Sequence, residues 1–212
     1  MPRKAMLLML GALAPLNLSC NLLVPAIFIG EHRKRVSAEF DKLENHRVAV
    51  MVWTDPSTLF DYPYARYELA SYVFDKLRAE MAQRKLAIDL VEPREVEDYL
   101  QKKIGTQIDP HALGQAFKAD YIVYLEVLKF QMRDARLPQF LRGEIDASVS
   151  VHDIHADPDQ LSRYELAPVA CQYPEGAPLL INATNAPLVR EATYRKFAEQ
   201  VARKFYEHHI DL

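Results

Sequence analysis

The chain has 212 residues, which suits one large domain or two small ones, and its 50% hydrophobic and 26% charged residues exclude a disordered or collagen-like protein. Its 26 basic and 29 acidic residues leave a formal net charge of −3, so no strong positive field favours nucleic acid. Two cysteines are too few for a disulfide-stapled scaffold or a four-thiolate zinc site.

The first twenty residues have the parts of a bacterial export signal. Two basic residues precede an uncharged stretch rich in Leu and Met, which ends shortly before Ser19 and Cys20. A basic start, a short apolar stretch and a small residue before the cleavage point are typical of a secretory signal. The cysteine resembles that of the lipobox of bacterial lipoproteins, although Asn17 stands where a lipobox usually has Leu. We predict a signal peptide over residues 1–19 and acylation, for example by palmitate, at Cys20.

Two other interpretations of this segment stay open. The apolar stretch from Ala5 to Ile29 is long enough to cross a bilayer as an uncleaved anchor, although Pro15 and Pro25 would disturb a single spanning helix. Alternatively, the chain is cleaved to a soluble form, or its start is assigned to the wrong methionine. The lipoprotein and the anchored form both place the domain outside the cytosol and hold it at a membrane.

A tether to the membrane is predicted over residues 20–45. Its apolar part, Leu22 to Ile29, would contact membrane lipid, and the basic cluster at 32–35 would meet anionic head groups. Asn21 follows the cysteine, which in a Gram-negative cell resembles lipoproteins passed on to the outer membrane. The predicted partners are membrane lipid, bound through Cys20 and Leu22 to Ile29, and another envelope protein.

Residues 46–212 are predicted to form a single α/β domain. The continuous apolar run from Val48 to Trp53 is typical of a strand buried on both faces. An amphipathic helix over 64–83 follows, then a strand over 86–91 and a helix after Pro93. A strand–helix–strand unit of this kind is normally parallel and right-handed.

The next part of the chain predicts two long strands. A short helix over 111–118 leads into a strand over 121–128, which is rich in aromatic and β-branched residues. Apolar and polar residues then alternate over 141–152, which indicates an antiparallel strand with one wet face, and His152 lies on that face.

The last part of the chain completes the predicted sheet. A fifth strand over 161–173 contains Pro168, which requires an edge position or a bulge. A loop and an amphipathic helix over 188–206 follow. The element order βαβα(α)βββα therefore predicts the α/β class, with a five-stranded mixed sheet and flanking helices.

No catalytic motif occurs in the sequence. It has neither a glycine-rich phosphate loop nor a Gly-x-Ser-x-Gly nucleophile elbow. His152, Asp153 and His155 are the best metal-binding candidates, but side chains three apart on a strand point to opposite faces, so the two imidazoles would converge only across the turn. Cys171 lies among apolar residues, which predicts a buried thiol rather than a nucleophile. We predict no catalytic residue, no metal and no cofactor.

The loop after the first predicted strand is unusually aromatic. Ligands of α/β sheets often bind beyond the ends of strands, and aromatic residues are enriched at protein interfaces. Packing of the loop against the core is the alternative. The possible interaction surface consists of Trp53, Phe60, Tyr62, Tyr64 and Tyr67.

The chain resembles the small α/β domain shared by several envelope lipoproteins, among them CsgG, LpoB and the amino-terminal domain of TolB. The resemblance covers about residues 46–210 and is carried by the strand at 48–52, the passage from Leu113 through Asp120 to Val123, and the closing helix. Members of this group act mostly through protein–protein contacts. The resemblance thus implies a non-enzymatic protein that acts through protein contacts. Together with the lipobox-like start and the tether, it predicts a membrane-anchored binding or scaffolding protein of the cell envelope.

Two alternatives to this function stay open. An envelope enzyme or small-ligand receptor would use the loops after the first and third strands, where α/β sheets commonly bind ligands. A pore or oligomer subunit would use the apolar segment and an exposed sheet edge for assembly, which makes a homo-oligomer possible.

Overall fold

The computed structural model describes residues 33–103, 109–156 and 162–211. Two compact units are present, and Arg35–His208 form the larger one, the α/β domain. The described residues 33–34 and 209–211 belong to the other unit. Strands β1 (Arg33–Val36) and β8 (His208–Asp211) pair in a two-stranded sheet of their own. The predicted signal peptide, Cys20 and the apolar segment Leu22 to Ile29 lie outside the described residues.

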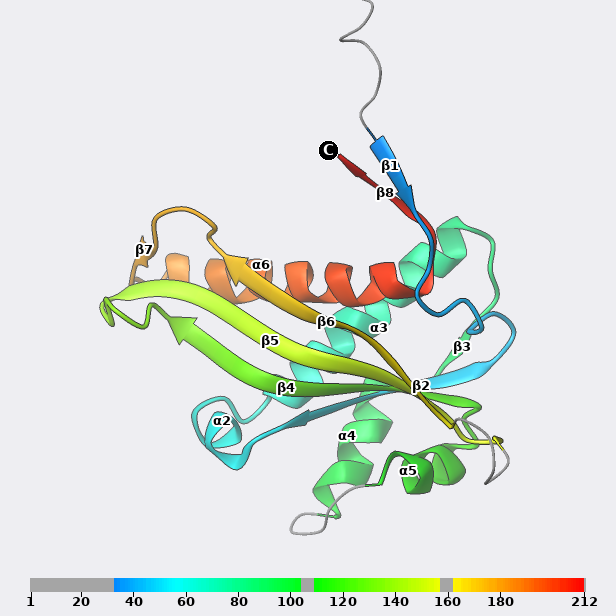
Figure 1. Cartoon of the computed structure of the whole chain (residues 1–212). Helices are drawn as coiled ribbons and strands as arrows, with labels where there is room; N and C mark the ends of the chain where they lie inside the picture. The colour runs from blue at the N-terminus through cyan, green and yellow to red at the C-terminus, as the bar shows by residue number, and fades with distance from the viewer. Residues whose placement is uncertain (1–32, 104–108, 157–161, 212) are drawn as a thin grey trace, which may run out of the picture. The chain divides into compact units, whose positions relative to one another are not determined.

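A mixed sheet organises the domain (Figure 1). Its strand order is β3-β2-β4-β5-β6, in which β2 is parallel to β3 and β4, and β5 is antiparallel to β4 and β6. The predicted α/β class and five-stranded mixed sheet are confirmed, and a short strand, β7, adds to the sheet by pairing with β5. The strands are β2 (Arg47–Thr54), β3 (Asp89–Leu90), β4 (Tyr121–Arg133), β5 (Phe140–Asp153), β6 (Arg163–Tyr173) and β7 (Leu179–Leu180).

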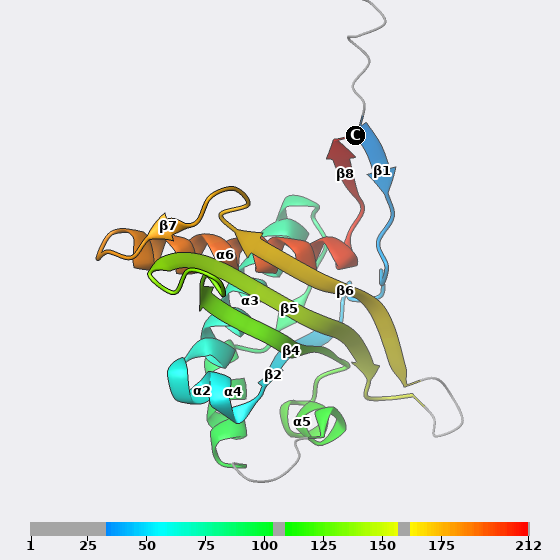
Figure 2. The same cartoon turned by 60° about the vertical axis from the view of Figure 1, so that its left-hand side comes forward.

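Helices cover both faces of the sheet (Figures 1 and 2). Successive side chains of a strand point to opposite faces, so β2 contributes to two separate cores. Val48, Val50 and Val52 pack with helices α3 and α6, whereas Ala49 and Met51 pack with α4 and α5. The helical elements are α2 (Pro56–Asp61), α3 (Ala65–Gln83), α4 (Pro93–Gln101), α5 (Pro110–Phe117), α6 (Asn185–Ala202) and the 3-10 turn η1 (Arg203–Phe205).

Several elements differ in extent from their predicted ranges. Strand β3 has two residues instead of the predicted six, because it pairs only with Arg47 and Val48 at the start of β2. Strand β4 continues to Arg133, since its second half pairs with the long strand β5 rather than with β2. Helix α2 and strand β7 form in segments predicted as loops.

Two residues of the segment 20–45, which was predicted as a tether, belong to the hydrophobic core. Phe40 and Leu43 are buried, and the ring of Phe40 lies edge-on to Tyr121 with a centroid distance of 5.4 Å. The backbone N–H groups of Glu39 and Phe40 donate to the carbonyl of Lys204 at 2.8 and 3.1 Å. These hydrogen bonds attach the segment before residue 46 to the turn η1, which follows α6.

His152 is buried, and its prediction on the solvent-exposed face of its strand is therefore wrong. The polar positions of β5 from residue 142 to 148 are half-exposed, but Ser150 and His152 are buried. The reason is helix α5, whose His111 ring lies 6.4 Å from that of His152, while Tyr124 of β4 lies 5.8 Å away. Helix α5 thus covers this end of β5, and the alternation in sequence does not reveal it.

Candidate functional site

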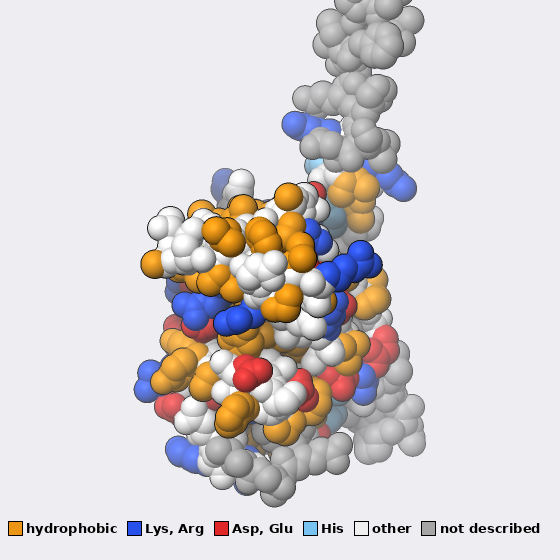
Figure 3. All heavy atoms as spheres, turned by 90° about the vertical axis from the view of Figure 1, so that its left-hand side faces the viewer, with side chains coloured by type: hydrophobic (Ala, Val, Ile, Leu, Met, Phe, Trp, Pro, Cys, Tyr) orange, Lys and Arg blue, Asp and Glu red, His pale blue; other side chains and the backbone are white. Residues whose placement is uncertain are grey.

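Exposed hydrophobic side chains gather at the end of the domain where α2, β7 and the start of α6 lie (Figure 3). At this end of the domain the most exposed are Phe60 at 87%, Tyr64 at 70% and Leu180 at 57%, whereas Leu128 of β4, which is 65% exposed, is not included in this group. Large apolar patches on the surface of a soluble protein commonly mark interaction sites. We call this region the apolar end and define it by Phe60, Tyr64, Leu137, Leu180, Ile181 and Leu188.

The lower part of the apolar end is built by the short helix α2. Asp55 caps it, because its Oδ1 accepts the backbone N–H groups of Ser57 and Thr58 at 2.9 and 3.0 Å. The same carboxylate also accepts the hydroxyl groups of Ser57 and Thr58, and these hydrogen bonds lower its pKa well below the usual value. Pro56 supplies a first helical residue that needs no N–H partner. The capped turn holds Phe60 at the surface.

A groove with a volume of about 340 Å³ lies beside this helix. It joins residues that are far apart in sequence, from the α2–α3 connection, the ends of the β4–β5 hairpin and the start of α6. The ring of Tyr62 packs on Phe130 at 5.0 Å, and Phe130 lies 6.1 Å from the buried Tyr194. We call it the Arg133 groove; its lining is Tyr62, Met132, Arg133, Leu141, Ile181, Ala186, Pro187 and Arg190.

Two guanidinium groups give the Arg133 groove its charge. Arg190 Nη1 is 3.8 Å from Glu68 Oε1, a long contact, and the other oxygen of Glu68 accepts the Tyr194 hydroxyl at 3.0 Å. Arg133 has no ion pair among the residues that the structure describes. The groove therefore combines an apolar floor with positive charge that is incompletely neutralised.

The five aromatic residues predicted as an interaction surface lie in different surroundings. Phe60 and Tyr64 are exposed at the apolar end, and Tyr62 is half-buried in the groove. Tyr67 is half-buried on α3. Trp53 is 38% exposed, and strand alternation places it on the α4 and α5 face of the sheet, away from Tyr62. The arginines and the β7–α6 residues of the groove were not predicted, because no local motif marks them.

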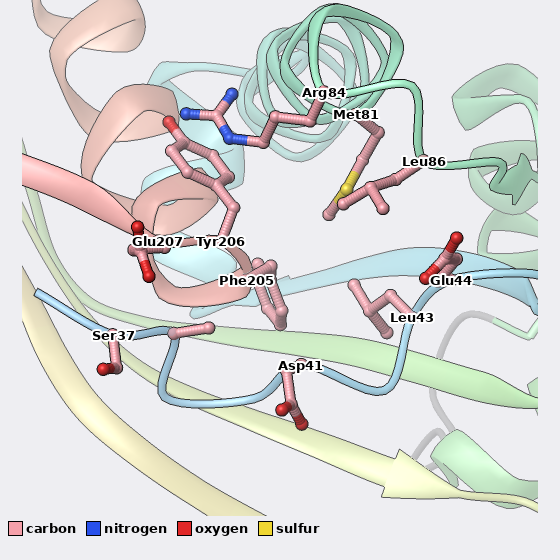
Figure 4. A pocket seen from close by; sticks show the side chains of 11 residues that line it. Ser37, Asp41, Leu43, Glu44, Met81, Arg84, Leu86, Phe205, Tyr206 and Glu207 are labelled. Atoms are coloured by element: carbon pink, nitrogen blue, oxygen red, sulfur yellow. The ribbon is translucent and has the colours of Figure 1, made fainter.

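A second cavity, of about 530 Å³, lies between the segment before β2 and the ends of α3 and α6 (Figure 4). The Arg84 guanidinium stacks on Tyr206 at 3.8 Å from the ring centroid and pairs with Glu80, so internal contacts engage its charge. Burial raises the pKa of Tyr206 to about 12, so this phenol stays protonated near neutral pH. Leu43 and Met81 form an apolar wall that belongs to the core.

The candidates for metal binding and catalysis do not converge. His155 Nε2 lies 3.0 Å from Asp120 Oδ1, whereas His152 faces Tyr124 and α5. Within residues 33–103, 109–156 and 162–211, no three metal-binding side chains come together. Ser150 Oγ and His152 Nε2 are 3.3 Å apart, but both residues are buried, and burial lowers the His152 pKa to about 4.

Cys171 is a buried thiol, as predicted. Burial raises its pKa to about 11, and its Sγ lies 3.8 Å from the carbonyl oxygen of Thr193. A thiol that is neutral and inaccessible is a poor nucleophile, because the thiolate is the reactive form.

No protein-family model and no curated protein matches the chain. In fold it is similar to the PelC dodecamer from Paraburkholderia phytofirmans, with 8% identity, 82% of this chain and 98% of that chain covered, and a TM-score of 0.44. The lipoprotein GNA1162 from Neisseria meningitidis has 11% identity and a TM-score of 0.36, with 73% of this chain and 99% of that chain covered. A minor lipoprotein from Acinetobacter baumannii has 12% identity and a TM-score of 0.31, with 77% of this chain and 92% of that chain covered. Two of these three structures are lipoproteins of bacteria, but values this low transfer no function to the chain.

Among the helices within residues 33–103, 109–156 and 162–211, none is both long and apolar enough to cross a bilayer.

Proposed function

We propose that this chain is a lipoprotein of the bacterial cell envelope, anchored to a membrane through Cys20, which acts by binding another envelope protein and performs no catalysis. The observation that carries the proposal is the apolar end, where Phe60, Tyr64 and Leu180 are exposed on a well-packed domain. Hydrophobic side chains held at the surface by ordered elements suit protein binding.

Four further observations support a non-catalytic protein of the cell envelope. The lipobox-like start and the resemblance to the CsgG, LpoB and TolB domain both indicate the cell envelope. The serine–histidine contact at Ser150 and His152 is closed to a substrate because both residues are buried. The Cys171 thiol is buried as well and is therefore closed to a substrate in the same way.

A small-ligand receptor is the second candidate function. The Arg133 groove favours it, because Tyr62 lies in the connection after β2 and Arg133 ends β4, and these strands correspond to the first and third of the predicted sheet. A groove of about 340 Å³ lies at the lower end of the size range of small-molecule sites.

The anchoring is tested by labelling with radioactive palmitate in the presence and absence of globomycin, which blocks the lipoprotein signal peptidase. We expect label on the wild-type chain, none on a Cys20→Ala variant, and accumulation of the precursor with globomycin. An unlabelled chain, or an intact chain free in the cytosol, contradicts the lipoprotein assignment.

Protein binding is tested by placing a photo-crosslinking amino acid at Phe60 or Leu180 in intact cells. Gln115, an exposed residue of α5, serves as the control position. We expect both sites at the apolar end to crosslink to one distinct envelope protein that the control does not capture. Crosslinks only between copies of this chain, or the same products from all three positions, contradict the proposal.

A further inference from the structure

We infer that the Arg133 groove binds a segment of a partner protein in which hydrophobic side chains lie next to carboxylates. The inference rests on the proposed function and specifies the chemistry of the partner. It goes beyond exposure of the apolar end, because the groove has a defined floor and two charged groups at fixed positions.

The composition of the groove is that of a protein interface. Interfaces are enriched in aromatic residues, Met and Arg, and depleted of Lys, Glu and Asp, relative to the rest of the surface. The groove contains Tyr62, Met132 and two arginines, and none of its eight lining residues is Lys, Glu or Asp. Met132 and Leu141 are themselves buried, so the floor is continuous with the hydrophobic core.

The charge of the groove determines the chemistry of its occupant. The side chain of Arg190 is half-exposed and has only the 3.8 Å contact with Glu68, and Arg133 is exposed without an ion pair in the described part of the chain. A guanidinium group presents a planar fork of donors that matches a carboxylate in a bidentate manner. Two such groups beside an apolar floor are complementary to Asp or Glu side chains that flank Leu, Ile, Phe or Met.

The groove is held in shape before any partner binds. Asn182 Oδ1 accepts the N–H groups of Thr184 and Asn185 at 3.0 and 2.7 Å, and Asn185 Nδ2 donates to Leu180 O at 2.8 Å. Ile181 N donates to Gln139 O at 3.2 Å, which ties the β7–α6 connection to the β4–β5 hairpin. Because these polar groups are satisfied internally, binding would need little additional ordering of this wall.

A protein segment fits these features better than a membrane surface does. Electrostatic binding to anionic lipid typically uses clusters of several Lys and Arg on a broad surface. Here the lining of the groove contains two arginines around a concave site, and the Lys and Arg side chains visible on this face border the hydrophobic ones (Figure 3). This arrangement favours an occupant that inserts apolar side chains and has its own carboxylates.

The inference is tested by fluorescence anisotropy with a labelled synthetic peptide of Leu, Phe and Glu, using the unlipidated mature chain, residues 20–212. A second peptide has Gln at every Glu, and a third has Ser at every Leu and Phe. The groove double variant combines Arg133→Gln with Arg190→Gln. The control double variant combines Arg78→Gln with Arg195→Gln, which makes the same change in charge at exposed sites outside the groove. Circular dichroism checks that each variant is folded.

We expect saturable binding of the acidic, hydrophobic peptide, weakened about tenfold or more by the groove double variant and unchanged by the control. The Gln and Ser peptides should also bind about tenfold more weakly, a result that does not depend on how well any variant folds. Absent peptide binding, or equal effects of the two double variants, overturns the inference. Binding of the protein to phosphatidylglycerol vesicles that is lost in the groove double variant, with no binding of the peptide, also overturns the inference.

The outcomes separate this inference from the proposed function. If photo-crosslinks at Phe60 and Leu180 identify a partner but the acidic peptide does not bind, the binding function stands and the groove inference fails. If the peptide binds as expected but no partner is crosslinked in cells, the groove chemistry holds and the proposed envelope partner is contradicted.

Discussion

The ammonium group of Lys204 lies 3.0 Å from Glu39 Oε1, although the two residues are 165 positions apart in the chain. The Lys204 side chain is only 7% exposed, so its charge needs this partner. The second oxygen of Glu39 accepts the N–H of Ala167 at 2.7 Å. Ala167 and Pro168 form the bulge of the edge strand β6. Glu39 thus joins the segment before β2, the turn η1 after α6 and the edge of the sheet.

Replacement of Glu39 should destabilise the domain. Glu39→Ala leaves the Lys204 ammonium without a carboxylate and the Ala167 N–H without its acceptor, and we expect a loss of about 1–3 kcal/mol in the free energy of unfolding. Urea unfolding followed by circular dichroism measures the change. Asp75→Ala removes an exposed helix ion pair with Arg78 and should cost less than about 1 kcal/mol. Equal losses for the two variants would contradict a stabilising role of the Glu39–Lys204 pair.

His152 should make the stability of the domain depend on pH. Its pKa falls from 6.5 to about 4, first because it is buried and then because of the positive charge of Arg163. Between these two values the unfolded chain binds a proton that the folded chain does not, so the free energy of unfolding decreases as the pH falls through this window. The full effect is about 3 kcal/mol, and His152→Gln should remove it.

The measurement for His152 is urea unfolding at a series of pH values from 7.5 to about 4. The difference between wild type and His152→Gln isolates this imidazole from the carboxylates, which titrate in both proteins. His209→Gln, at an exposed position, is the control and should keep the wild-type slope. Parallel pH profiles for wild type and His152→Gln would show that His152 is not the titrating group.

Gly143 of β5 is needed for the close approach of α6 to the sheet. A Cβ atom at this position would lie 1.9 Å from Thr193 Oγ1 and 2.8 Å from Thr193 Cβ, and Thr193 is fully buried. We expect Gly143→Ala to lower the free energy of unfolding by about 1–3 kcal/mol through overpacking. Gly176→Ala adds a Cβ with no atom within 4 Å and serves as the control. A Gly143→Ala protein as stable as this control would contradict the packing argument.

The sequence predicts those elements whose signals are local. The apolar run at 48–53 and the alternation at 141–151 indicate the central strands, because strand burial repeats with a fixed period. Asp109, which directly precedes Pro110 in the sequence, accepts the N–H of His111 at 3.0 Å and caps α5. Pro168 lies in an edge strand and at a bulge, as a residue without an N–H requires.

Features formed by distant segments could not be predicted in this way. Phe40 reaches the core through a segment whose residues 39 and 40 bond to Lys204, and His152 is buried where α5 packs against its strand. The Arg133 groove brings Tyr62 and Arg190 together across more than half of the chain, and neither residue belongs to a recognisable motif. The sequence indicated the aromatic loop beside the groove, but the arginines and the β7–α6 wall follow from tertiary packing.

Asp55 should control the shape of the loop that presents Phe60. Its side chain caps α2 by accepting the N–H groups of Ser57 and Thr58, and Asp55→Ala removes both acceptors. We expect a loss of about 1 kcal/mol in the free energy of unfolding and faster amide hydrogen exchange in α2, with the rest of the domain unchanged. Asp55→Asn keeps an acceptor oxygen and should restore most of the protection. If the photo-crosslinks at Phe60 depend on this rigid turn, they should weaken in Asp55→Ala while those at Leu180 persist. Unaltered exchange in α2 of Asp55→Ala would show that the cap does not hold the loop.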